Sequence, residues 1–335
     1  MKRIVVTLVA TCLILLLPEC ALITKGADSP GNPQPSASSS AAAASAAAAS
    51  VAQPQSQSLV PVAAIQPQAP FPAGPIQLLI PLATPGRRVL KNDEAEIDYS
   101  NIKDGYIMAR YMKPTKQALR LLVATPNKIE YVYPLADNGK FEVFPFSEGN
   151  GAYTITIYKQ TAGSQVSNAY TTVLSLSLDV QIKNETAPFL IPNLFVNFSE
   201  KSLFMEKTAE FATLRDNREI VEAIYKFIIQ NVKYNKDTVE EEDWYIPDLD
   251  RVYTELTGIC IDYATLMVAM ARSAGVPARL VTGYTRDGCH AWVEIYFEQT
   301  GWERMDPTVF AVGRVQRNNL AFIADDSNYT RMYQY

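Results

Sequence analysis

The hydrophobic and polar positions divide the chain into four stretches of different character. A basic pair, Lys2-Arg3, precedes an apolar run from Ile4 to Leu17. Residues 28–85 then consist mostly of Ser, Ala, Pro and Gln. Short apolar runs separated by turn residues fill residues 87–180, and apolar residues at helical spacing begin at Ile220. The pattern therefore predicts an N-terminal stretch without a core, then a strand-rich region, then a region that mixes helices and strands.

The first apolar run predicts an export signal. Its length of about 14 residues is short for a membrane-spanning helix, which needs ~20, and the basic residues before it complete the pattern of a signal. Leu17-Pro18-Glu19-Cys20 resembles a bacterial lipobox, in which Cys20 would carry a lipid, although Glu19 stands where a small residue is usual. Lipid attachment at Cys20, cleavage near Gly26 and an uncleaved anchor are three alternatives that the sequence leaves open.

We expect residues 1–26 to be this export signal or lipoprotein leader and residues 27–86 to be a disordered tether. Alanine, serine, proline and glutamine bury too little apolar surface to offset the entropy lost on ordering. The predicted location is exported: at the cell surface, as a membrane-anchored lipoprotein, or secreted. Contact with a membrane is expected only through the N-terminal anchor or lipid.

Residues 87–183 are predicted to form a small all-β domain, an immunoglobulin-like sandwich. Apolar and β-branched runs recur at short intervals, and Asp137-Asn138-Gly139 and Gly149-Asn150-Gly151 supply turns between them. The predicted strands are residues 106–112, 119–124, 129–134, 141–145, 153–158 and 170–178. Because this region holds no histidine, cysteine or carboxylate cluster, we expect a spacer or docking domain.

Residues 184–335 are predicted to form a second, α+β domain. The pair Asp216-Asn217 is a candidate N-cap for a helix over residues 218–232, whose apolar residues lie at helical spacing. A second helix is predicted over residues 262–272, ended by Gly275 and Pro277. Aromatic and β-branched residues favour strands over residues 290–296 and 302–306.

Three residues of this domain have the chemistry of a nucleophile, a base and an orienting carboxylate. Cys260 follows a predicted turn, Thr257-Gly258-Ile259, and comes just before the second helix, so its sulfur would lie at the positive end of the helix dipole. His290, the only histidine in the chain, opens a strand. Asp306 ends the next strand, from which its carboxylate could reach the second imidazole nitrogen.

The residues around these three resemble the core motifs of the transglutaminase-like superfamily. The resemblance covers roughly Val196 to Phe310 and implies a papain-related α+β core, with the cysteine on a helix N-terminus and the histidine and aspartate on an antiparallel sheet. It also implies Cys260 as nucleophile, His290 as base and Asp306 as orienter. The motifs that carry it are, in chain order, Gly258-Ile259-Cys260-Ile261-Asp262-Tyr263-Ala264, Ala274-Gly275-Val276-Pro277-Ala278-Arg279, Val281-Thr282-Gly283-Tyr284, His290-Ala291-Trp292-Val293-Glu294 and Asp306-Pro307-Thr308.

Trp244 and Tyr245 lie upstream of Cys260, where members of that superfamily place a loop that walls the substrate cleft. An indole or phenol donor from this loop would assist the backbone N–H of Cys260 in stabilising an oxyanion. Simple packing is an equally weighted alternative for both side chains.

Composition excludes several other functions. The formal net charge is −5 and no basic cluster appears, which argues against a nucleic-acid partner. The acidic run Glu240-Glu241-Glu242-Asp243 lacks the alternating spacing of a calcium loop, so no metal and no cofactor are expected. Cys289 directly precedes His290. We expect Cys289 to be a small buried residue, and the alternative is that it forms a reversible disulfide with Cys260.

The sequence thus predicts a thiol-dependent enzyme that attacks an amide carbonyl and forms a thioester. Capture of the thioester by an amine would be transglutaminase chemistry, and capture by water would be peptidase or amidase chemistry. The expected partner is an extracellular peptide or protein substrate, with cell-wall peptide as a candidate. The alternative from another class is a catalytically silent binding or scaffold module at the cell surface.

Overall fold

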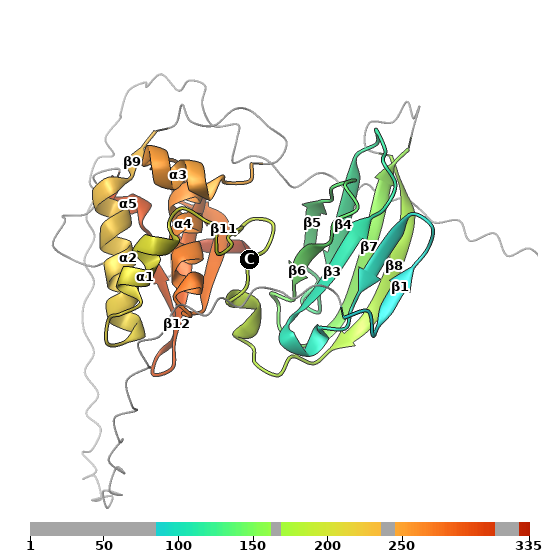
Figure 1. The fold of residues 1–335 in the computed structure, drawn as a ribbon, viewed down its shortest axis with the longest axis horizontal. Helices are drawn as coiled ribbons and strands as arrows, with labels where there is room; N and C mark the ends of the chain where they lie inside the picture. Colours follow the sequence, from blue (N-terminus) through green and yellow to red (C-terminus); the bar gives the residue numbers. More distant parts are fainter. Residues whose placement is uncertain (1–84, 162–168, 236–244, 312–327) are drawn as a thin grey trace, which may run out of the picture. The chain divides into compact units, whose positions relative to one another are not determined.

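A computed structural model describes residues 85–161, 169–235, 245–311 and 328–335, with side chains for all but residues 310 and 311. Eight strands between residues 89 and 180 form two four-stranded antiparallel sheets (Figure 1). The first has the order β1-β2-β3-β6 and the second the order β5-β4-β7-β8. The strands are β1 (Val89–Lys91), β2 (Ala95–Asp98), β3 (Tyr106–Tyr111), β4 (Leu119–Ala124), β5 (Glu130–Pro134), β6 (Glu142–Pro145), β7 (Gly151–Gln160) and β8 (Tyr170–Val180).

The two sheets share a hydrophobic core. Successive strand residues point to opposite faces, so Ile97 and Ala109 of one sheet, and Leu121 and Ile155 of the other, are buried together. All six predicted strands occur. The short strands β1 and β2 were not predicted. Strand β1 has three residues, which are too few to show an alternating pattern of apolar and polar residues. The likeness of this sandwich to an immunoglobulin fold stays a prediction.

The region after residue 184 begins with a short connection and two helices. A 3₁₀ turn (Ala187–Phe189) precedes α1 (Met205–Phe211) and α2 (Asn217–Asn231). Of the predicted pair, Asp216 is the N-cap of α2, because its side chain accepts a hydrogen bond from the Glu219 N–H at 2.9 Å, and Asn217 is the first residue of the helix. After α2, the region continues with β9 (Lys233–Tyr234) and α3 (Leu249–Glu255). Another short 3₁₀ turn, Ile102–Asp104, belongs to the sandwich.

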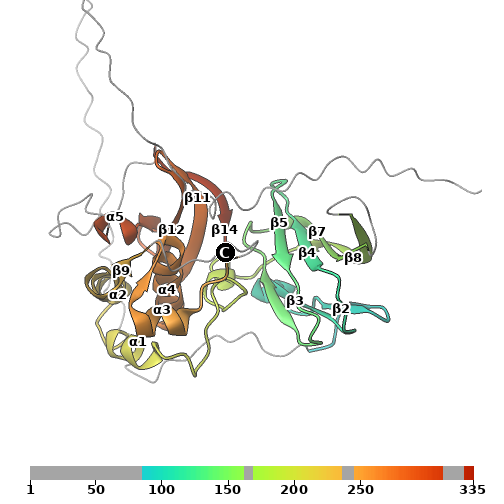
Figure 2. The same cartoon turned by 90° about the horizontal axis from the view of Figure 1, so that it is seen from above.

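Helix α4 (Cys260–Ser273) is the central element of the second region. Every residue from Asp262 to Ser273 is buried, which is why its sequence is apolar on all sides rather than along one stripe. It packs against α1, α2, α3 and two strands of a four-stranded antiparallel sheet of order β13-β12-β11-β14 (Figures 1 and 2). The strands are β11 (Ala278–Thr285), β12 (Gly288–Phe297), β13 (Gly301–Met305) and β14 (Thr330–Gln334), and α5 (Thr308–Ala311) follows β13.

The predicted turn before Cys260 is wrong in detail. Residues Thr257–Gly258 form strand β10, which pairs in parallel with β9. A two-residue strand carries no alternating pattern, so the glycine alone suggested a turn. The pairing matters for the site because it places Tyr234 opposite Gly258, two residues before Cys260.

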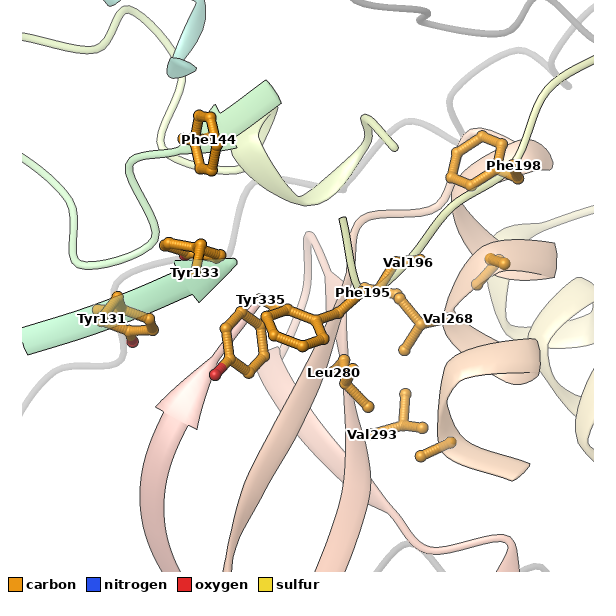
Figure 3. Packing of buried hydrophobic residues seen from close by; sticks show 14 of the residues in the cluster. Tyr131, Tyr133, Phe144, Phe195, Val196, Phe198, Val268, Leu280, Val293 and Tyr335 are labelled. Atoms are coloured by element: carbon orange, nitrogen blue, oxygen red, sulfur yellow. The ribbon is translucent and has the colours of Figure 1, made fainter. Parts of the chain in front are cut away.

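One continuous hydrophobic cluster joins the sandwich to the second region. Tyr131 and Tyr133 of β5 contact Tyr335, which in turn packs on Phe195 with a ring separation of 4.4 Å (Figure 3). The buried Arg272 of α4 donates hydrogen bonds to the backbone carbonyls of Ile191, Ala278 and Tyr335. Burial lowers the pKa of Arg272 to about 9.

No helix in the described ranges is both long and apolar enough to cross a membrane. The predicted leader over residues 1–26, with Cys20, and the predicted tether up to residue 84 lie outside the described residues, as do Trp244 and the acidic run before it.

Candidate active site

Cys260 is the first residue of α4, so its backbone N–H and its sulfur lie at the positive end of the helix dipole. The preceding residue, Ile259, has an extended backbone and cannot cap the helix with its own side chain. The cap comes instead from Asp262, whose Oδ2 accepts a hydrogen bond from the Ile259 N–H at 2.8 Å. The start of the helix, and with it the position of Cys260, therefore depends on the Asp262 carboxylate.

Two side chains hold the buried Asp262 carboxylate from its other side. The Tyr245 hydroxyl donates to Oδ1 at 2.6 Å, and Arg251 in turn donates to the Tyr245 hydroxyl at 3.1 Å. Burial raises the pKa of Asp262, whereas the hydrogen bonds from Tyr245 and Ile259 and the charge of Arg251 oppose that rise. The Tyr245 hydroxyl hydrogen is therefore committed to Asp262 in this arrangement and is not free for a substrate oxygen.

Gly258 is required by the same cap. A Cβ at Gly258 would lie 2.6 Å from Cβ and 2.7 Å from Oδ2 of Asp262, closer than non-bonded atoms approach. The spacing of Gly258, Cys260 and Asp262 in the first motif thus has a physical explanation. The glycine leaves room for the carboxylate that folds back over the start of α4.

The antiparallel pairing of β12 and β13 brings His290 and Asp306 together. Val293 pairs with Met305, so Asp306 immediately follows the last paired residue of β13 and lies near the N-terminal half of β12. His290 Nε2 and Asp306 Oδ2 are 2.6 Å apart. With Nε2 bound to the carboxylate, Nδ1 is the ring nitrogen left for Cys260, whose side chain forms a hydrogen bond with the imidazole.

The Asp306 carboxylate is fully buried and both its oxygens accept hydrogen bonds. The backbone N–H and the hydroxyl of Thr308 donate to Oδ1, at 2.9 and 2.5 Å. The Tyr329 hydroxyl donates to Oδ2 at 3.0 Å, sharing that oxygen with His290. These donors fix the orientation of the carboxylate and so the plane of the imidazole.

The electrostatics of the pair favour an imidazolium and a carboxylate. Burial alone would lower the pKa of His290, but the hydrogen bonds to Asp306 and Cys260 outweigh it and raise the pKa to about 10. Burial acts to raise the pKa of Asp306, but the hydrogen bond and charge of His290 and the donors from Thr308 bring it below its usual value. A cationic His290 beside Cys260 is the setting that stabilises a cysteine thiolate.

Tyr234 lies beside the backbone amide of Cys260. The phenol oxygen receives a hydrogen bond from this N–H, although burial and the nearby Cys260 raise the pKa of Tyr234 to about 12. The hydroxyl consequently keeps its proton at neutral pH. The Cys260 N–H and the Tyr234 hydroxyl therefore lie side by side at the N-terminus of α4.

The structure thus brings Cys260, His290 and Asp306 into one hydrogen-bonded series. No role was predicted for Tyr234, Thr308 or Tyr329, although Thr308 lies in the last of the motifs. Tyr234 and Tyr329 belong to strands or segments far from the motifs along the chain, and nothing in their local pattern distinguishes them from packing tyrosines. Cys260 is a free thiol, so it is not joined to Cys289. Among the described residues, no group of three or more His, Cys, Asp and Glu side chains is arranged as metal ligands would be.

Residues 206–307 match the model of the transglutaminase-like superfamily. Over 98 residues the chain is 34% identical to an uncharacterized protein of Bacillus subtilis, YebA, covering 22% of this chain and 13% of that protein. Over 95 residues it is 33% identical to a protein-glutamine gamma-glutamyltransferase of Pseudomonas aeruginosa, covering 24% of this chain and 14% of that protein. The chain therefore matches only a small part of the length of these relatives.

The chain also matches solved structures that are distant in sequence. A putative cysteine protease from Cytophaga hutchinsonii has 18% identity and a TM-score of 0.34, covering 66% of this chain and 68% of that chain. The periplasmic domain of TgpA from Pseudomonas aeruginosa has 14% identity and a TM-score of 0.32, covering 67% of this chain and 96% of that chain.

Proposed function

We propose that the protein catalyses thiol-dependent acyl transfer or hydrolysis at amide carbonyls, because residues 206–307 match the model of the transglutaminase-like superfamily. The observation that carries this proposal is the hydrogen-bonded series of Cys260, His290 and Asp306, with the cysteine at a helix N-terminus. Nucleophilic catalysis by cysteine needs a thiolate, a positioned acid–base group and a donor for the oxyanion, and each has a candidate here.

The reaction begins with attack of the Cys260 thiolate on the carbonyl carbon of a carboxamide or peptide bond. The carbonyl oxygen becomes an oxyanion, which replaces the Tyr234 oxygen as acceptor of the Cys260 N–H and also accepts a hydrogen bond from the Tyr234 hydroxyl. The imidazolium of His290 gives its Nδ1 proton to the leaving nitrogen as the C–N bond breaks, and an acyl thioester on Cys260 remains. Neutral His290 then takes a proton from the second substrate.

An amine or water completes the cycle. Its attack on the thioester carbonyl forms the second tetrahedral intermediate, and the C–S bond breaks to restore the Cys260 thiolate and the His290 imidazolium. Amine capture yields a new amide, whereas water yields a carboxylic acid. We propose an extracellular peptide or protein as acyl donor, with cell-wall peptide as a candidate, on the strength of the signal-like sequence before residue 26.

A glutamine-containing peptide and a labelled primary amine test this function. Wild-type protein is expected to release ammonia or a shortened peptide, and Cys260→Ala is expected to do neither. Incorporation of the labelled amine identifies transglutaminase chemistry, and release of product without incorporation identifies hydrolysis. If wild type and Cys260→Ala are indistinguishable on a panel of glutamine and cell-wall peptides, the enzyme proposal fails in favour of a binding module.

A further inference from the structure

Tyr329 contacts both members of the proposed acid–base pair. Its hydroxyl donates to Asp306 Oδ2 at 3.0 Å, the same oxygen that binds His290 Nε2. Its ring centroid lies 6.3 Å from that of His290 and 5.2 Å from that of Trp292, which follows His290 on the same face of β12. The guanidinium of Arg304 stands 4.8 Å from the centre of the same ring. Tyr329 is thus packed from three sides with its hydroxyl aimed at the carboxylate.

The segment that carries Tyr329 is placed by a close backbone approach at Gly283. This residue of β11 pairs with His290 on one side and with Arg331 of β14 on the other, at an irregularity in the β14 register. A Cβ at Gly283 would lie 2.0 Å from the backbone oxygen of Thr330 and 2.9 Å from the Trp292 ring. Glycine is therefore needed for β14 to lie close enough that Tyr329, one residue before it, reaches Asp306.

The far end of β14 is held by the β-sandwich. The Gln334 backbone N–H donates to the Tyr131 hydroxyl at 3.2 Å, and its side-chain amide donates to the backbone oxygen of Ser147 at 2.6 Å and to Glu148 at 3.1 Å. Gln334 is buried, so these bonds are shielded from water. Strand β14 consequently links the sandwich to the catalytic carboxylate.

We propose that Tyr329 is a positioning residue, which shares Asp306 Oδ2 with His290 and so limits how tightly the carboxylate holds the imidazolium proton. A hydroxyl that donates to a carboxylate disperses its negative charge. Without this donor, the charge on Oδ2 would act on His290 alone, and the imidazolium would be a poorer acid toward the leaving nitrogen. On this account the sandwich, expected from the sequence to be a spacer or docking domain, also supports the site by holding β14.

The single histidine makes the inference measurable without a substrate. In protein labelled with ¹⁵N-histidine, both ring signals belong to His290, and their shifts report the protonated fraction as pH rises. At pH 10 the wild-type ring should be about half protonated, as its pKa of about 10 requires. Tyr329→Phe keeps the ring and removes the hydroxyl, so its midpoint should rise by about 0.5–1 unit. The other ionisable groups around the pair are the same in both proteins: Cys260, Tyr234, Tyr225 and Arg304.

Tyr333→Phe is the matched control. Tyr333 lies on the same strand and packs on Tyr131 and Tyr335, and its charged or titratable neighbours are Glu130 and Tyr284. Removal of the Tyr333 hydroxyl should leave the midpoint of the His290 pH titration at the wild-type value. With an active substrate from the peptide panel, Tyr329→Phe should also lower kcat several-fold, with KM unchanged.

The inference rests on the proposed function, yet it fails separately from it. A His290 midpoint in Tyr329→Phe that equals the wild-type value or falls below it overturns the positioning role, even if Cys260 proves to be an active nucleophile. Gly283→Ala gives a second variant, in which displacement of Thr330 should also move the midpoint. Circular dichroism at each pH confirms that the compared proteins are folded.

Discussion

At the residue scale, the site is built around one buried carboxylate whose two oxygens have separate tasks. Thr308 holds Oδ1, while Oδ2 faces His290 and Tyr329. The three proposed catalytic residues were predictable, since a cysteine before a helix and a histidine and an aspartate at strand ends are recognisable along the chain. The tyrosines that surround them were not, because the contacts that distinguish them from packing residues connect segments distant in sequence.

The raised pKa of His290 predicts a loss of stability at high pH. A histidine has an unfolded pKa near 6.5, and in the folded protein it rises to about 10. The extra stabilisation of the protonated form is therefore fully present below pH 6.5 and disappears as pH rises through about 10. This stabilisation of the folded state is on the order of a few kcal/mol at most, because His290 titrates together with Asp306 and Cys260 and the free energy belongs to the three groups jointly.

Urea unfolding across pH 6 to 10 measures this contribution. The difference in unfolding free energy between wild type and His290→Gln should shrink steadily as pH rises, because glutamine does not titrate. A difference that stays constant over this range would contradict an imidazolium at neutral pH.

Tyr234 gives a prediction about the oxyanion. Replacement of Tyr234 by Phe removes one donor and leaves the Cys260 N–H, so kcat should fall by about 10- to 100-fold. Alkylation of Cys260 by iodoacetamide, which forms no oxyanion, should change little. If both rates fall together, Tyr234 acts on the thiol and not on the oxyanion.

At the element scale, the position of the nucleophile depends on how α4 begins. Asp262→Ala removes the acceptor for the Ile259 N–H and leaves the Tyr245 hydroxyl without its buried partner. We expect a loss of about 1–3 kcal/mol of unfolding free energy and a slower alkylation of Cys260, since the first turn of the helix loosens.

Asp216→Ala is the matched control for this variant. Asp216 caps α2 by the same kind of bond, to the Glu219 N–H, and the α2 N-terminus carries none of the proposed catalytic residues. It should lose about 1 kcal/mol and leave alkylation unchanged. Equal alkylation rates in Asp262→Ala and wild type would show that the cap does not position Cys260.

The elements with clear caps or a clear pattern were predictable, whereas the eight-residue strand β11 was not predicted. Helices α2 and α4 have caps and many apolar positions, and both were expected close to their observed bounds. Strand β10 has only two residues, and apolar and polar residues do not alternate regularly along β14. Neither strand therefore has a sequence pattern that predicts it. Both exist because a partner strand pairs with them, which is a tertiary effect.

At the scale of the whole molecule, the sandwich and the α+β region share one hydrophobic cluster and the hydrogen bonds of Gln334. Two regions could be predicted from the change in periodicity near residue 184. Their connection could not, because Tyr131 and Gln334 are 203 residues apart in the sequence. The predicted export signal and tether stay predictions, since residues 1–84 lie outside the described ranges.

Gln334→Ala tests this connection. Loss of the buried bonds to Ser147 and Glu148 should lower the unfolding free energy by about 1–3 kcal/mol. Gln181→Ala removes an exposed glutamine that bonds only a neighbouring carboxylate in the described structure, and it should change stability by less than about 0.5 kcal/mol. Thermal unfolding of the two variants beside wild type makes the comparison, and equal stability of Gln334→Ala and wild type would contradict the linking role of β14.

The central claim, that His290 activates Cys260 as a nucleophile, is tested most directly by the rate of iodoacetamide alkylation at pH 6.5. The account predicts that wild-type Cys260 reacts about tenfold or more faster than Cys260 in folded His290→Ala, because only the wild type pairs the sulfur with an imidazolium. Mass spectrometry of the labelled peptide assigns the rate to Cys260. Equal rates in the two proteins would contradict the account.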